Sequence, residues 1–101
     1  MKDELISLRV KGTQYADALI GDGDIVVLKK TSEVEDGGLA AVFIKSEQQM
    51  VIKRVYRGDY GISLVACNPS VASMHLDFDD YEIHGKVLIV IRQYDRDEAQ
   101  P

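Results

Sequence analysis

The chain has 101 residues, and its 46% hydrophobic and 29% charged residues are typical of one globular domain, not of a disordered tail. Twelve basic against 17 acidic residues give a net charge of −5, which argues against unaided binding of nucleic-acid phosphates. A single cysteine excludes an internal disulfide, and no apolar run is long enough to span a bilayer. We therefore expect one cytoplasmic domain over residues 1–101, without a membrane partner.

Short apolar segments with a period of two follow one another along the chain and predict β-strands. The first covers residues 5–10 and is followed by at most one helical turn at 16–20 and a Gly-Asp turn at 21–24. Further strands are expected at residues 25–28, 39–44, 50–56, 62–66, 71–78 and 82–92. The strand at 25–28 is expected to be buried on both faces, and the last strand to bend at Gly85.

Seven short strands with almost no helix predict an all-β domain, a small antiparallel β-barrel-like fold. A polar tail is expected over about residues 95–101. No group of cysteine, histidine and carboxylate residues has the spacing of metal ligands, so we expect neither a metal nor a cofactor.

Lys53 interrupts the apolar pattern of the strand predicted at residues 50–56. Alternation places it on one face of the strand together with Val51 and Val55. Such a lysine either extends its ammonium group into solvent from the sheet, or is buried and neutral. A neutral lysine amine can act as a general base toward a hydroxyl nucleophile. The pattern alone leaves both alternatives open.

Several motifs occur in an order that resembles the LexA-type serine peptidase family. The segment Val10-Lys11-Gly12-Thr13-Gln14-Tyr15 resembles the family pattern Val-x-Gly-x-Ser-Met, and residues 21–24 resemble its Gly-Asp-Gly-Asp-like turn. Residues 51–56 resemble its Val-x-Lys-Arg strand, 67–69 its Glu-Asn-Pro element and 81–92 its closing strand. The resemblance covers about residues 5–94. It implies the fold of the C-terminal domains of LexA, lambda-like phage repressors and UmuD-like proteins, which cleave themselves and dimerise.

The family's nucleophilic serine is replaced here by Gln14, and the methionine after it by Tyr15, while Lys53 occupies the general-base position. A glutamine amide is not a nucleophile toward a peptide carbonyl. We therefore predict an inactive peptidase with a vestigial cleft formed by Gly12, Thr13 and Tyr15. Lys53 is expected within hydrogen-bond reach of Gln14.

The resemblance also implies a homodimer, because family members dimerise through surfaces that include the closing strand. The expected interface is its apolar segment Val87-Leu88-Ile89-Val90-Ile91. Alternation places Val87, Ile89 and Ile91 on one face. Either a partner chain or the rest of the domain must cover the second apolar face.

The leading prediction is thus self-association of a transcriptional repressor of the SOS or phage type, with DNA contacted only through a separate helix-turn-helix domain outside these residues. Two alternatives stay open. One is an active self-cleaving peptidase with an unorthodox nucleophile such as Thr13, although the chain has neither the Ala-Gly nor the Cys-Gly dipeptide that the family cuts. The other is a UmuD-related module that holds a peptide or linker segment in the cleft without cutting it.

Overall fold

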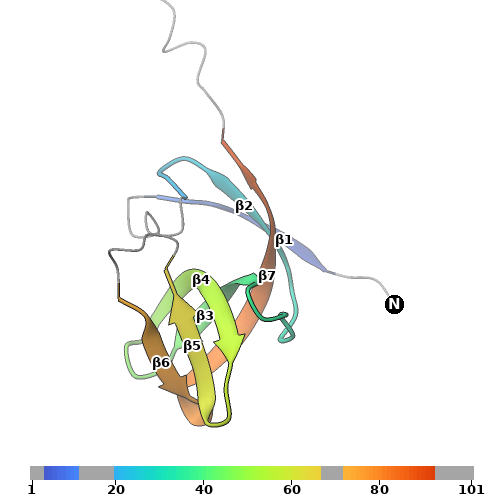
Figure 1. The fold of residues 1–101 in the computed structure, drawn as a ribbon. Helices are drawn as coiled ribbons and strands as arrows, with labels where there is room; N and C mark the ends of the chain where they lie inside the picture. The colour runs from blue at the N-terminus through green and yellow to red at the C-terminus, as the bar shows by residue number, and fades with distance from the viewer. Residues whose placement is uncertain (1–3, 12–19, 67–71, 93–101) are drawn as a thin grey trace, which may run out of the picture.

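The computed structural model describes residues 4–11, 20–66 and 72–92, and within them seven antiparallel strands form one sheet in the order β1-β2-β7-β3-β4-β5-β6 (Figure 1). The elements are β1 (Leu5–Arg9), β2 (Ile25–Lys29), β3 (Leu39–Ile44), β4 (Gln49–Arg57), β5 (Gly61–Val65), β6 (Met74–Asp77), the 3-10 helix η2 (Phe78–Asp80) and β7 (Tyr81–Ile91). The predicted all-β class with seven short antiparallel strands is confirmed. The expected helical turn before Ile20, the segment at 67–69 and the polar tail lie outside the described residues.

Most predicted strands match the structure to within one residue at each end, and two predictions need correction. The strand expected at residues 71–78 begins only at Met74 and ends at Asp77, because the chain turns there into the 3-10 helix. The strand β2 is buried on one face only. Val26 and Leu28 are 0% and 5% exposed, whereas Ile25 and Val27 are half-buried.

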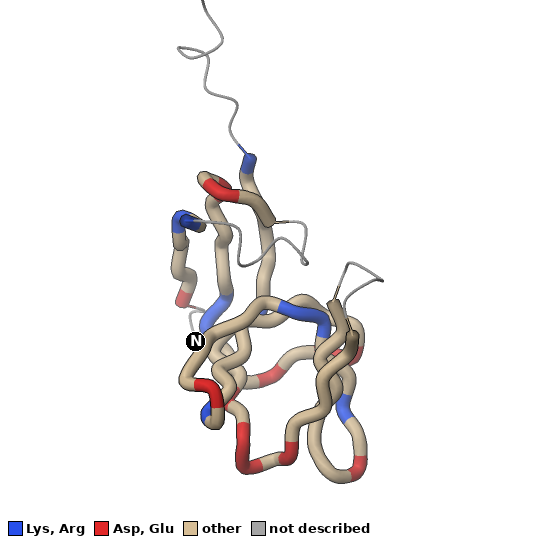
Figure 2. Tube along the Cα trace, turned by 90° about the vertical axis from the view of Figure 1, so that its left-hand side faces the viewer, with Lys and Arg blue, Asp and Glu red and all other residues tan. Residues whose placement is uncertain are grey.

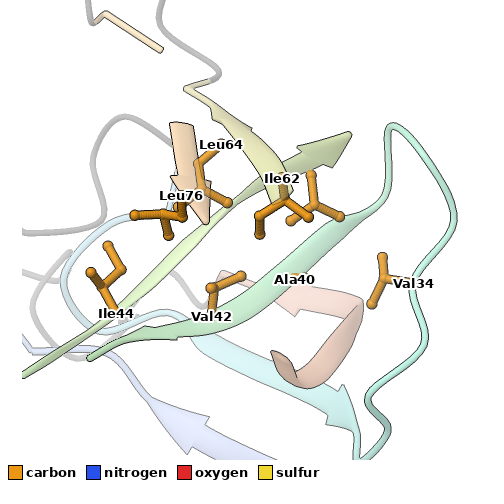
Figure 3. Close-up of a cluster of buried hydrophobic side chains, with 8 residues drawn as sticks. Val34, Ala40, Val42, Ile44, Ile62, Leu64 and Leu76 are labelled. Atoms are coloured by element: carbon orange, nitrogen blue, oxygen red, sulfur yellow. The ribbon is translucent and has the colours of Figure 1, made fainter. Parts of the chain in front are cut away.

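Buried side chains form two clusters. The first cluster belongs mainly to β3, β4, β5 and β6 and consists of Val34, Ala40, Val42, Ile44, Val55, Ile62, Leu64 and Leu76. Figure 3 shows side chains of β5 and β6 turned toward those of β3, as expected where a sheet curls around its own core. The second cluster consists of Val10, Ile20, Val26, Leu28, Ala41 and Ile52. It connects β2 with the β3–β4 hairpin.

The strand β7 joins the two parts of the sheet. Its residues 81–86 pair with β3, and its residues 86–91 pair with β2. Gly85 lies at this change of partner, where an added Cβ would stand 3.2 Å from the carbonyl oxygen of Lys29. Glycine therefore permits the close approach of β2 at the point where the sequence predicted a bend.

Figure 2 shows the basic and acidic positions of the described residues spread over several strands and turns. In residues 4–11, 20–66 and 72–92 there is no helix with the length and apolar character needed to cross a membrane.

Candidate functional site

Lys53 lies in the middle of β4, directly opposite Ala40 of β3. Its neighbours Val51 and Val55 pack on the first cluster, whereas Ile52 belongs to the second. The predicted alternation is thus found in the structure. Lys53 is half-buried, so its exposure lies between those of the two alternatives, a solvent-exposed and a fully buried lysine. Its correspondence to the family's general-base position stays a prediction.

A second lysine shares this face and was not predicted from the sequence. Ala40 pairs with Lys53 on one side and with Lys86 of β7 on the other. Residues paired directly across antiparallel strands point to the same face, so the two lysines flank Ala40 about 10 Å apart, twice the strand spacing. The ammonium group of Lys86 lies 3.5 Å from an exposed carboxylate oxygen of Glu35. Only the register of three strands brings these lysines into one row.

The predicted nucleophile position, Gln14, and the cleft residues Gly12, Thr13 and Tyr15 lie outside the described residues. The two ends of this part of the chain are described, and they are joined by backbone hydrogen bonds. The Val10 N–H donates to the Asp24 carbonyl at 2.8 Å, and the Gly23 N–H donates to the Val10 carbonyl at 2.8 Å. Val10 and Ile20 both pack in the second cluster with Ile52, the residue before Lys53. The motif segments around Val10 and around Lys53 therefore meet at one cluster.

The turn at residues 21–24 is held by a buried carboxylate. Asp24 is only 2% exposed, and its Oδ2 atom accepts a hydrogen bond of 2.8 Å from the Gly21 N–H. Arg92 donates to both of its oxygens, from Nε at 3.0 Å and from Nη2 at 2.8 Å. These bonds, first the one from Arg92 and then the one from Gly21, lower the pKa of Asp24 from 3.8 to about 2. The sequence indicated a turn here and gave no signal of its partner, which lies 68 residues away.

An apolar cavity of about 280 Å³ opens beside Val10. Because Ile52 lines it, the cavity lies on the opposite side of β4 from Lys53. Its lining residues are Leu8, Arg9, Val10, Lys11, Val26, Leu28, Ala41, Met50 and Ile52. Most of these lining residues are apolar, and the two cationic ones are Arg9 and Lys11.

The C-terminal half of β7 exposes a row of large apolar side chains. The exposed fractions are 45% for Leu88, 52% for Ile89, 38% for Val90 and 41% for Ile91, and Val87 is half-buried against the second cluster. Within the described strands, this half of β7 pairs with β2 on one edge only.

The expected alternation along this segment is wrong for Val87. The register shifts between Val27 and Leu28 of β2, so that Leu28 pairs with Val87 but Val27 pairs with Ile89. Val87 consequently faces the second cluster, whereas Ile89 faces the other way. The same pairing places four residues on one outer face, which we call the β2–β7 patch: Ile25, Val27, Ile89 and Ile91.

Comparison with known proteins identifies the family. Residues 1–88 match the family model described as "Peptidase S24-like". The chain is 36% identical over 89 residues to the LexA repressor of Herpetosiphon aurantiacus, covering 88% of this chain and 42% of that protein. It is 38% identical over 88 residues to the LexA repressor of Thermosipho africanus, covering 87% of this chain and 43% of that protein. It thus spans about two-fifths of the length of these relatives, and on the evidence of these sequence matches it belongs to the peptidase S24-like family.

Proposed function

We propose that this domain is a catalytically silent member of the family that serves self-association in a transcriptional repressor or a related regulator. The observation that carries the proposal is the exposed apolar end of β7 with the adjoining β2–β7 patch. Large contiguous apolar surfaces on small domains mark interaction sites. The relatives' name, LexA repressor, supports a regulator of transcription.

The symmetry of the contact follows from the strand geometry. Residues 87–91 pair with β2 on one edge and with none of the other described strands, so within the described part of the chain the second edge offers backbone donors and acceptors beside exposed apolar side chains. A second copy related by a two-fold axis would present the same edge and the same patch, so the contact would join like to like. Self-association would place two DNA-binding domains, carried on separate parts of the regulator, on two half-sites at once.

Catalytic silence rests on the amide at position 14. In the family pattern this position carries the serine that attacks the peptide carbonyl, and Lys53 serves as its base. With Gln14 the base has no hydroxyl to activate. Self-association does not use the serine, so this part of the family's activity remains available to the domain.

Light scattering coupled to size exclusion tests the proposal on the intact chain. We expect the mass of a dimer at about 50 µM and a shift toward the monomer at about 0.5 µM, a range that corresponds to roughly −6 to −9 kcal/mol of association free energy. A monomer mass throughout this range would contradict self-association through the isolated domain.

The apolar cavity beside Val10 favours one second function, namely binding of a peptide or linker segment without cleavage. A fluorescent peptide with the sequence of a LexA linker, containing its Ala-Gly bond, distinguishes the candidates. A rise in anisotropy with an unchanged peptide mass supports the binding module, and its loss in Leu8→Asp, a change at a 48% exposed residue that lines the cavity, would assign the peptide to the cavity. Cleavage of the peptide would instead support an active enzyme.

A further inference from the structure

Arg92 connects the end of the proposed interface strand to the base of the segment that carries position 14. It follows Ile91 directly, and its guanidinium group makes the two hydrogen bonds to Asp24 described above. The side chain of Arg92 is 51% exposed, whereas that of Asp24 is only 2% exposed. A charge-assisted pair in this parallel geometry fixes both position and orientation.

Asp24 in turn binds two residues of that base, Gly21 and Val10. Its side chain accepts the Gly21 N–H, and its main-chain carbonyl accepts the Val10 N–H. The Gly23 N–H donates back to Val10, and Arg9 donates to the Gly23 carbonyl at 3.3 Å. Residues 9–10 and the turn at 21–24 are therefore joined through Gly23 and Asp24, and of these two residues Asp24 is the one that Arg92 binds.

Without Arg92, the buried Asp24 carboxylate would keep the hydrogen bond from the Gly21 N–H but would lose the two from the guanidinium group. A buried carboxylate with too few donors is unfavourable, so the turn would open to hydrate it. Opening of the turn would also break the hydrogen bond from the Val10 N–H to the Asp24 carbonyl, because Asp24 accepts both this bond and the one from Gly21.

We infer that Arg92 is a positioning residue through which the end of β7 holds the base formed by Val10 and residues 20–24. We call the hydrogen bonds that connect Arg92, Asp24, Gly21 and Val10 the latch. These bonds do not depend on the proposed self-association through β7, whereas a use of the latch in regulation rests on it. A partner that orders β7 would then also order the base, and by reciprocity an ordered base would favour association.

Hydrogen exchange of individual amides tests the latch in the intact chain. In Arg92→Gln we expect the Val10, Gly21 and Gly23 amides to exchange at least about tenfold faster than in the wild type. The Val55 amide, which donates to the Gly38 carbonyl and belongs to a residue of the first cluster, should keep its exchange rate. Arg92→Lys retains the charge but not the two-pronged geometry and should recover only part of the protection.

The controls separate the latch from general stability and from association. Arg57→Gln removes another arginine, which donates to the Val34 carbonyl at 3.0 Å, and should leave the base amides unchanged. Equal acceleration of all amides in Arg92→Gln, or no acceleration at the base, would overturn the latch. A wild type that stays monomeric would refute the proposed self-association, while the exchange of the base amides in Arg92→Gln would still decide the latch.

Discussion

Val87 and Ile89 are two positions apart on β7, yet they face opposite sides of the sheet. The register slip beside them, which pairs Leu28 with Val87 and Val27 with Ile89, is the cause. Val87 is thereby drawn into the second cluster, and Ile89 is released to the outer face with Ile91. The slip therefore creates the apolar patch that we propose as the contact between two copies.

The close approach of β5 and β6 predicts a strong difference between two neighbouring glycines. A Cβ at Gly61 would overlap the Leu76 carbonyl oxygen and stand 3.0 Å from the Asp77 Cα, whereas a Cβ at Gly58 would meet its nearest atom at 3.7 Å. Gly61→Ala should lower the free energy of unfolding by about 1–3 kcal/mol. Gly58→Ala, the matched control, should change it by less than about 0.5 kcal/mol. Urea denaturation measures both, and equal effects would refute the close pairing of β5 with β6.

Core packing predicts a second difference in stability. Leu64 is 0% exposed in the first cluster, whereas Leu5 is 59% exposed on β1. Leu64→Ala should cost about 2–5 kcal/mol through lost apolar burial and the cavity left behind, and Leu5→Ala about 0.5 kcal/mol or less. Thermal denaturation of the two variants checks this order. A larger effect at Leu5 than at Leu64 would contradict the assignment of Leu64 to the core and of Leu5 to the surface.

Much of the fold was predictable because strand positions depend on local patterns. The apolar run that became β3 and the alternation around Lys53 were both visible in the sequence. Long-range relationships were not. The row of Lys53, Ala40 and Lys86 exists only once the register of three strands is fixed, and a single sequence does not specify a register.

The same reason explains what was missed at the candidate site. Asp24 was identified as part of a turn from its glycine neighbours, a local signal. Its pairing with Arg92 depends on β7 running back alongside β2, which no local signal indicates. The slip that turns Ile89 outward is likewise a feature of the pairing of two strands rather than of either sequence.

The lowered pKa of Asp24 predicts a specific dependence of stability on pH. Because the folded-state pKa of about 2 lies below the ordinary 3.8, the ionised group stabilises the fold above about pH 4 and loses this contribution as the pH falls through 2. Asp24→Asn should be less stable than the wild type at pH 7, and the difference should shrink between about pH 4 and pH 2.

Thermal melts of both proteins over this range measure the effect. Glu82, whose pKa is also lowered, first by its hydrogen bond with His84 and then by Lys45, is present in both proteins, so their difference isolates Asp24. Asp36→Asn, which alters an exposed carboxylate that accepts the Arg57 N–H, serves as the control. A constant gap between the wild type and Asp24→Asn at all pH values would contradict the assignment.

The amide at position 14 predicts no self-cleavage. After incubation at about pH 10, near the ordinary pKa of a free lysine side chain, the intact mass of the chain should be unchanged. Lys53→Ala should behave identically, because the general-base position has no nucleophile to serve. A discrete fragment that disappears in Lys53→Ala would instead demonstrate an active enzyme with another nucleophile.

Sedimentation equilibrium of Ile89→Asp beside Phe78→Asp tests the central claim most directly. Both changes introduce a carboxylate at a position that is more than half exposed, 52% for Ile89 on the β2–β7 patch and 59% for Phe78 in η2. An unpaired carboxylate buried in an interface costs several kcal/mol, so we predict a monomer for Ile89→Asp and a wild-type dimer for Phe78→Asp, with unchanged circular dichroism for both. A dimer that persists in Ile89→Asp, or is lost in Phe78→Asp instead, would contradict self-association through β7.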